Sequence, residues 1–165
     1  MNGGEDMLDH LYKNMNVALE EAVEAFDAGE VPVGAIIVKE GKIISRAHNI
    51  KEEKKSPLMH AEIDAINKAC INLGDWRLAD CEIYVTMEPC IMCAGAIINA
   101  RIKRLYYGAF DMIAGADGGL VNIFGIKNLT HHVEVYGGIM EKECRDILGK
   151  FFRQVRNDKR YNKEM

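Results

Sequence analysis

The strongest constraint on the fold is the order in which helical and strand-like patterns follow one another along the chain. Apolar residues that recur every three or four positions predict a first helix over residues 7–28, ended by Gly29. Two β-branched runs follow, 33–39 and 42–47, and the Glu40-Gly41 pair between them is typical of a hairpin turn. Further helices are expected over 57–71, 91–99 and 139–156, and further strands over 82–87, 102–107 and 132–136. This alternation predicts an α/β sandwich with helices on both faces of a mixed sheet.

Size and composition place limits on the class of protein. A chain of 165 residues, of which 48% are apolar, can bury one core, so we expect a single domain over residues 1–165. The absence of a long apolar run and of a signal-like N-terminus, together with five cysteines, leads us to expect a cytoplasmic protein with reduced thiols and no membrane association.

The charge distribution excludes one mode of nucleic-acid binding. A net charge of -4 argues against coating of nucleic acid by bulk electrostatics. The exception is the basic C-terminal helix expected from about residue 139, because eight Lys or Arg lie between Lys142 and Lys163. The charged segment 51–55 is expected to be a solvated connection.

Two cysteines, Cys90 and Cys93, stand three residues apart directly behind Pro89. Proline is favoured in the first turn of a helix, and side chains at this spacing lie on one face of that turn. The free N–H groups and positive end of a helix lower the pKa of a thiol, which favours the thiolate that binds metal. The pair therefore predicts two ligands of a metal ion, and zinc needs more than two.

His60 is the candidate third ligand, because strand–helix connectivity brings helix N-termini together along one edge of a sheet. Three protein ligands leave the fourth tetrahedral position of zinc to water, which is the arrangement of a catalytic site. Glu62, two residues past His60, would then carry protons for a reaction of that water. His-x-Glu followed by Pro-Cys-x-x-Cys is the signature already known for zinc-dependent nucleobase deaminases.

Other interpretations exist for the same residues. A Cys-x-x-Cys pair alone is also typical of a redox pair or of half a four-ligand structural zinc site. His48, His131 and His132 could complete such a site, although none has ligand-like spacing to the two cysteines. The remaining cysteines are more typical of small core residues: Cys70, Cys81 and Cys144.

Several longer segments resemble one family. They are GEVPVGAIIV (29–38), AHN (47–49), PCIMCAGAIINARI (89–102), YYGAFD (106–111) and FFRQVR (151–156). Across almost the whole chain the sequence resembles the cytidine-deaminase-like superfamily and, within it, the bacterial tRNA-specific adenosine deaminases. The resemblance implies conversion of adenosine to inosine at the wobble position of a tRNA anticodon, by a homodimer with one Zn²⁺ per subunit and no organic cofactor. It also implies a three-layer α/β/α sandwich around a five-stranded mixed sheet.

The resemblance also implies roles for particular residues. The zinc ligands would be His60, Cys90 and Cys93, and the proton carrier Glu62. Residues around the base and the anticodon loop would be Asn49 as a partner of the flipped base, Val33 and Ala61 on the pocket wall, Asp111 beside neighbouring nucleotides, and Phe152, Arg153 and Arg156 on the last helix. From the residues alone, Asn49 is more simply a turn asparagine, and the last helix an amphipathic cover with a solvated basic face.

One segment departs from the family pattern. At residues 108–119 the family usually carries Asp-x-Lys-x-Gly-Ala ending in Gly-Ser, whereas this chain keeps Asp111 but has Ile113 and Gly119 in place of the lysine and the serine. Phe110 also stands where a polar residue is common. We expect the lost cation to affect RNA affinity rather than the chemistry, because phosphate contacts position a nucleic acid and base contacts set its identity.

Two other functions are compatible with the sequence. The first is a deaminase of the same superfamily that acts on a free base, nucleoside or nucleotide of the guanine or cytosine type, which the altered loop and the acidic charge would suit. The second is a non-catalytic zinc protein that binds RNA or serves as a structural subunit. The intact Glu62 argues against the second function.

Overall fold

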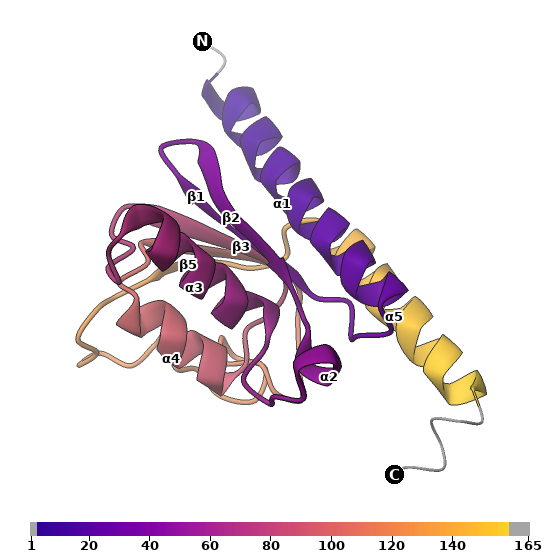
Figure 1. Ribbon diagram of the computed structural model, residues 1–165. Coiled ribbons are helices and arrows are strands. Elements are labelled where there is room, and N and C mark those ends of the chain that lie inside the picture. Colours follow the sequence, from indigo (N-terminus) through magenta and orange to yellow (C-terminus); the bar gives the residue numbers. More distant parts are fainter. Residues whose placement is uncertain (1–2, 159–165) are drawn as a thin grey trace.

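The computed structural model describes residues 3–158 and is built around a five-stranded sheet (Figure 1). Its strands lie in the order β2-β1-β3-β4-β5, with β1 antiparallel to both of its neighbours and β3, β4 and β5 parallel to one another. Their bounds are β1 (Gly34–Lys39), β2 (Lys42–His48), β3 (Cys81–Met87), β4 (Arg104–Ala109) and β5 (Glu134–Tyr136). The expected five-stranded mixed sheet is confirmed.

Helices cover both faces of this sheet. Figure 1 shows α1 and α5 on one side and α3 and α4 on the other, so the expected three-layer α/β/α sandwich is also confirmed. The helices are α1 (Gly3–Asp27), α2 (Lys51–Lys54), α3 (Ala61–Leu73), α4 (Ile91–Asn99) and α5 (Glu141–Asn157). Within the described residues, no helix is both long enough and apolar enough to cross a membrane.

The sheet separates two apolar layers. Ile37, Ile83 and Leu105 pack beneath α3 and α4, whereas Ile36 and Tyr84 pack beneath α1 and α5. Successive residues of a strand point to opposite faces, so a strand covered on both sides has to be apolar at every position. This is why β1 reads as an unbroken apolar run.

Gly34, the first residue of β1, lies in direct contact with α1. A Cβ atom at this position would collide with the backbone of α1 at Ala18 and Ala22. The Gly34 N–H donates a hydrogen bond to the Thr86 hydroxyl of β3 over 3.1 Å. The backbones of helix and strand therefore touch, which fixes the distance between α1 and the sheet.

The structure corrects several expected boundaries. The first helix begins at Gly3 rather than residue 7, and β5 is limited to residues 134–136. The segment expected as an irregular connection over 51–55 contains the short helix α2, whose N–H groups at Glu52 and Glu53 donate to the buried Glu30 carboxylate over 3.1 and 2.7 Å. That stabilisation comes from a residue 22 positions away, which local sequence patterns do not show.

The helix expected from residue 57 instead begins at Ala61. His60 has extended backbone angles, with φ -75° and ψ 156°, and forms the N-cap of α3. The Met59 N–H donates to the Ser56 carbonyl in a turn that contains Pro57. Proline disfavours helical geometry in the residue before it, so the chain turns here before α3 begins.

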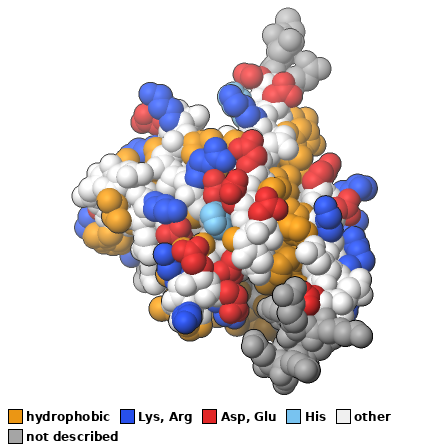
Figure 2. All heavy atoms as spheres, turned by 45° about the vertical axis from the view of Figure 1, so that its right-hand side comes forward, with side chains coloured by type: hydrophobic (Ala, Val, Ile, Leu, Met, Phe, Trp, Pro, Cys, Tyr) orange, Lys and Arg blue, Asp and Glu red, His pale blue; other side chains and the backbone are white. Residues whose placement is uncertain are grey.

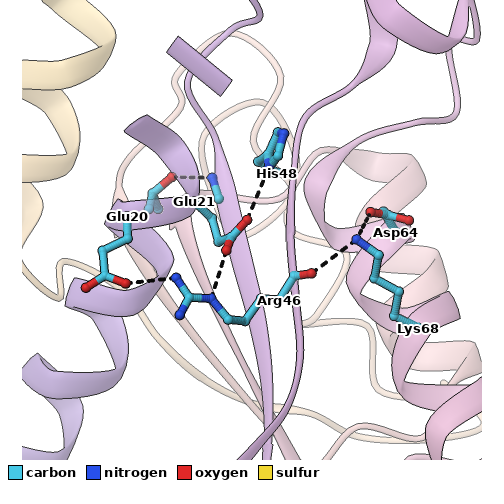
Figure 3. Close-up of polar contacts among 8 residues, drawn as sticks. Glu20, Glu21, Arg46, His48, Asp64 and Lys68 are labelled. Carbon is cyan, nitrogen blue, oxygen red and sulfur yellow. Dashed lines mark hydrogen bonds and ion pairs between the residues drawn. The ribbon is translucent and has the colours of Figure 1, made fainter. Parts of the chain in front are cut away.

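A polar network connects α1, β2 and α3 (Figure 3). Glu21 of α1 accepts hydrogen bonds from Arg46 Nε at 2.8 Å and His48 Nδ1 at 3.0 Å, both on β2. On the other side of the strand, Lys68 of α3 donates to the Arg46 carbonyl over 3.2 Å and pairs with Asp64. Burial opposes ionisation of Glu21, but its hydrogen bonds from His48 and Arg46 hold its pKa below the ordinary value of 4.5.

We expect Glu21→Gln to destabilise the fold by about 1–2 kcal/mol at pH 7, because a mostly buried charged acceptor is lost. Since the folded pKa of Glu21 is lowered, its contribution is present above pH 4.5 and disappears as the pH falls through the folded value. In urea unfolding, the difference in the free energy of unfolding between the variant and the wild type should therefore shrink below about pH 4. Glu20→Gln is the control, because Glu20 pairs with the same Arg46 from an exposed position and should matter little. A loss for Glu21→Gln that does not change with pH would contradict this assignment.

Candidate metal and active site

The direction of the strands brings two helix N-termini to the same edge of the sheet. β2 and β3 both run antiparallel to β1 and therefore run in the same direction. The chain leaves both strands at the same edge, where it enters α3 through His60 and α4 through Cys90. Cys90 is the N-cap of α4, with extended angles of φ -74° and ψ 174°, as His60 is of α3. Both side chains therefore precede the first helical turn.

The three predicted ligands meet at this edge. His60 Nδ1 lies 3.7 Å from Cys90 Sγ and 3.5 Å from Cys93 Sγ, and all three candidate ligand atoms lie within 4.8 Å of one another. Zn–N and Zn–S bonds of about 2.0 and 2.3 Å at tetrahedral angles would place N and S about 3.5 Å apart. One nitrogen and two sulfurs at this spacing fit the coordination distances of zinc.

The electrostatics of the cluster favour a thiolate at its centre. A hydrogen bond from the Cys93 thiol, together with His60, lowers the pKa of Cys90 to about 4. The hydrogen bond with Cys90 in turn raises the pKa of His60, and it raises that of Cys93 as well. Thiolate sulfur is the form that binds metal, so Cys90 already favours the charge state of a metal ligand.

Glu62 lies beside the three ligand residues and is not one of them. It is the second residue of α3, its side chain is 4% exposed, and it interacts with the Cys93 thiol. Burial raises the pKa of Glu62 to about 7. A carboxyl group with a pKa near neutrality can both accept and give a proton at physiological pH.

A cavity of about 230 Å³ opens above these residues. His60, Ala61, Glu62 and Cys90 belong to its lining, together with two further groups of residues that we call its two walls. One wall contains Val31, Val33 and Asn49, and the other contains Glu88, Asp111 and Ala114. The structure thus brings together all the predicted pocket residues, including Val33, Asn49, Ala61 and Asp111.

Asn49 combines a turn with a place in the pocket. Its Oδ1 accepts a hydrogen bond from the Lys51 N–H at 3.2 Å, and its Nδ2 donates to the Val31 carbonyl at 3.2 Å. The first contact is that of an ordinary turn asparagine. An amide side chain has two N–H donors and two oxygen lone pairs. Asn49 therefore keeps one N–H and one lone pair with which it can bind a ligand.

The predicted RNA-contacting residues Phe152, Arg153 and Arg156 lie on α5 and do not line the cavity. All three are exposed, while the neighbouring Phe151 is buried against Phe26 of α1. The helix is therefore an amphipathic cover with an exposed basic side. Three of the eight predicted basic residues, Lys159, Arg160 and Lys163, lie outside the described residues. Figure 2 shows acidic and basic side chains interspersed on this side of the molecule.

Two of the three alternative histidine ligands contact groups outside the cluster. His48 contacts Glu21, and His131 Nε2 contacts the Ile102 carbonyl at 2.7 Å. Cys81 and Cys144 are fully buried, as expected of core residues, and the partly exposed Cys70 donates its S–H toward the Trp76 carbonyl. Within residues 3–158, the group whose ligand atoms could together hold a metal ion consists of His60, Cys90 and Cys93.

Five pocket residues were missed by the sequence interpretation: Val31, Lys51, Met87, Glu88 and Ala114. Glu88 had a detectable signal, because an ionisable residue directly follows an apolar strand and precedes Pro89-Cys90. Val31 and Lys51 had none, since each resembles an ordinary loop residue. Ile113, which replaces the lysine of the family pattern, is 85% exposed and supplies no charge at the pocket.

Comparison with known proteins identifies relatives with the same fold. Residues 9–156 match the MafB19-like deaminase family. The chain is 44% identical over 152 residues to a tRNA-specific adenosine deaminase of Bacillus subtilis, covering 92% of this chain and 93% of that protein. A tRNA-specific adenosine deaminase of Aquifex aeolicus is 48% identical over 147 residues, covering 87% and 95%.

Solved structures agree with these relationships. A structure from a study of A-to-I editing by tRNA:A34 deaminases superposes with a TM-score of 0.79 at 44% identity, covering 82% of this chain and 98% of the other. A guanine deaminase of Bacillus subtilis superposes with a TM-score of 0.59 at 33% identity, covering 90% and 97%. On sequence and fold together, the chain belongs to the MafB19-like deaminase family and, within it, to the tRNA-specific adenosine deaminases, which are hydrolytic enzymes.

Proposed function

We propose that this chain is a zinc-dependent enzyme that converts adenosine to inosine at the wobble position of tRNA anticodons, with residues 1–165 acting as one catalytic domain. The observation that carries the proposal is the buried Glu62 carboxyl beside a His-Cys-Cys cluster at the base of a cavity. The two cysteine ligands need reduced thiols, which supports a cytoplasmic location. The sequence and structural relatives described above support the choice of adenosine in tRNA.

His60, Cys90 and Cys93 would hold the metal ion. Zinc in such a three-ligand site acidifies water, which makes a nucleophile available at neutral pH. Glu62 accepts the proton that this nucleophile releases and gives it to N1 of the adenine as C6 is attacked. Glu62 then takes the proton of the hydroxyl group that is now on C6 and passes it to the amino nitrogen, which leaves as ammonia while C6 becomes the carbonyl of inosine. A carboxyl group with a pKa of about 7 suits both transfers.

The cavity suits one base. Its volume of about 230 Å³ lies below the roughly 300–1,000 Å³ of sites for drug-sized ligands. Val33 and Ala61 supply apolar walls, and Asn49 supplies an amide that can pair with the edge of a base. Asp111 belongs to the second wall, where neighbouring nucleotides would pass. An anticodon loop presents its bases unstacked, which lowers the cost of inserting one of them.

The C-terminal end of α5 is close enough to the pocket to contact the same RNA. Gly29 lines a small cavity with Phe151 and Gln154 of α5, and Val31 lines the catalytic cavity. Two residues apart, Gly29 and Val31 lie within about 7.6 Å of each other. The exposed Phe152, Arg153 and Arg156 can therefore stack on loop bases and contact phosphates beside the pocket.

We also propose that the enzyme is a homodimer whose subunits meet through α3 and α4. A groove between these helices is lined by apolar residues, among them Ile63, Cys70 and Ala96. Trp76, which also lines the groove, is 53% exposed, and Ile71 on α3 is 79% exposed. Contiguous exposed apolar surface of this kind marks association sites.

The central experiment is incubation of the purified protein with an anticodon stem-loop carrying adenosine at the wobble position. We expect inosine at that position by sequencing and one ammonia per inosine. The same loop with adenosine moved by one position, and free adenosine, should react more than about tenfold slower, since lost binding interactions lower the rate. Free guanine and cytidine form the remaining arms. Faster release of ammonia from a free base than from the stem-loop would overturn the proposed substrate.

Glu62→Gln should lower kcat by about 10² to 10⁴ while one zinc per chain is retained, because the proton carrier is lost and the ligands remain. Asp64→Asn is the matched control: Asp64 is a carboxylate in the first turn of the same helix, paired with Lys68 at 2.7 Å and outside the pocket lining. This control should retain both zinc and turnover. Turnover of Glu62→Gln at the wild-type rate would remove Glu62 from the mechanism.

The dimer is tested by sedimentation of the double variant Ile71→Asp/Trp76→Glu. Charges on the proposed interface should convert the protein to monomers without unfolding it, because both side chains are largely exposed within one chain. Val23→Asp places a similar charge on an exposed apolar position of α1, on the other face of the sheet, and should leave the dimer intact. A double variant that sediments like wild type would place the interface elsewhere.

A further inference from the structure

Glu88, at the end of β3, is a buried carboxylate whose charge is balanced by backbone groups. It is 3% exposed, and no Lys, Arg or His among residues 3–158 pairs with it. Its carboxylate instead accepts three N–H groups: Asp111 N to Oε2 at 2.9 Å, and Asp117 N and Gly119 N to Oε1 at 2.9 and 3.1 Å. All three donors belong to the loop of residues 108–119.

This loop is attached to the metal-ligand segment around the carboxylate. The Ala116 N–H donates to the Pro89 carbonyl at 2.9 Å, and Gly115 forms a β-bridge with Cys90. Within the loop, Asp111 Oδ1 accepts the N–H groups of Ile113 and Ala114 at 2.9 and 3.1 Å. Glu88 therefore lies between a proposed zinc ligand and the loop that carries the Asp111 and Ala114 wall of the pocket.

Two glycines permit this arrangement. A Cβ atom at Gly115 would collide with the Glu88 carboxyl group, and one at Gly119 would collide with the Asp111 carbonyl. The serine that the family pattern carries at position 119 therefore has no room in this conformation of the loop. The departure from the family pattern at this position coincides with a backbone N–H that binds Glu88.

We propose that Glu88 is a positioning residue, which holds the 108–119 loop against the metal-ligand segment so that Asp111 and Ala114 form a fixed wall for the nucleotide. As far as it concerns substrate binding, this inference rests on the proposed function. Glu88 acts through the loop, and the proton transfers belong to Glu62. Its loss should therefore weaken substrate binding more than it slows the chemical step.

The test is Glu88→Gln, which keeps the shape of the side chain but turns an amide NH2 group, itself a donor, toward at least one backbone N–H donor. We expect faster amide hydrogen exchange over residues 108–119, an unchanged zinc content, and a KM for the stem-loop raised about 5- to 100-fold. The value of kcat should stay within about twofold, as for an interaction equal in ground and transition states.

Glu30→Gln is the matched control. Glu30 is equally buried and also accepts two backbone N–H groups, but those of Glu52 and Glu53 in α2. The Glu30→Gln variant should speed amide hydrogen exchange at residues 51–54 and leave exchange at residues 108–119 unchanged. A second variant, Gly119→Ser, keeps the Glu88 charge and should displace the loop, giving faster exchange over 108–119 and a raised KM.

Wild-type exchange of the loop in both Glu88→Gln and Gly119→Ser would overturn the inference. So would a joint loss of zinc and kcat at unchanged KM in Glu88→Gln, which would make Glu88 a support of the metal site. The exchange measurement needs no substrate. If wild-type protein failed to deaminate the stem-loop, the proposed function would fall, while hydrogen exchange would still decide whether Glu88 holds the loop.

Discussion

The site depends on one topological constraint, the antiparallel placement of β1 between β2 and β3. This placement makes β2 and β3 parallel, so the helices that follow them begin at the same edge of the sheet. His60 and Cys90 occupy equivalent N-cap positions of α3 and α4, and each has extended backbone angles. The positive ends of two helices therefore converge on one point, where the Cys90 thiolate is favoured.

The local part of this arrangement could be predicted from the sequence. Cys90 and Cys93 belong to one helical turn, so their separation follows from helix geometry alone. His60 is 30 residues from Cys90 and could be assigned only with the additional premise that helix N-termini share an edge. The role of Glu62 was predicted from its position two residues after His60. Because His60 has an extended backbone and Glu62 is helical, the two side chains can point to different groups.

The remaining features depend on contacts between distant segments. The short helix α2 forms where the pattern indicated an irregular connection, because Glu30 binds its first N–H groups from 22 positions away. The late start of α3 follows from the turn around Pro57, whose extent the apolar pattern does not define. Glu88 belongs to the same class: its partners are 23 to 31 residues away and are backbone groups, so no side-chain pattern identifies them.

The two walls of the pocket differ in construction. The wall of Val31 and Val33 precedes β1, and Gly34 brings that strand into backbone contact with α1. Because the helix cannot approach or recede without a change in the strand, this wall has a fixed position. The second wall is carried by the loop of residues 108–119, whose position depends on hydrogen bonds to one side chain, Glu88. Changes in base preference within this fold should therefore arise through residues 108–119. Val31 and Val33 would meanwhile keep a constant position relative to the bound nucleotide.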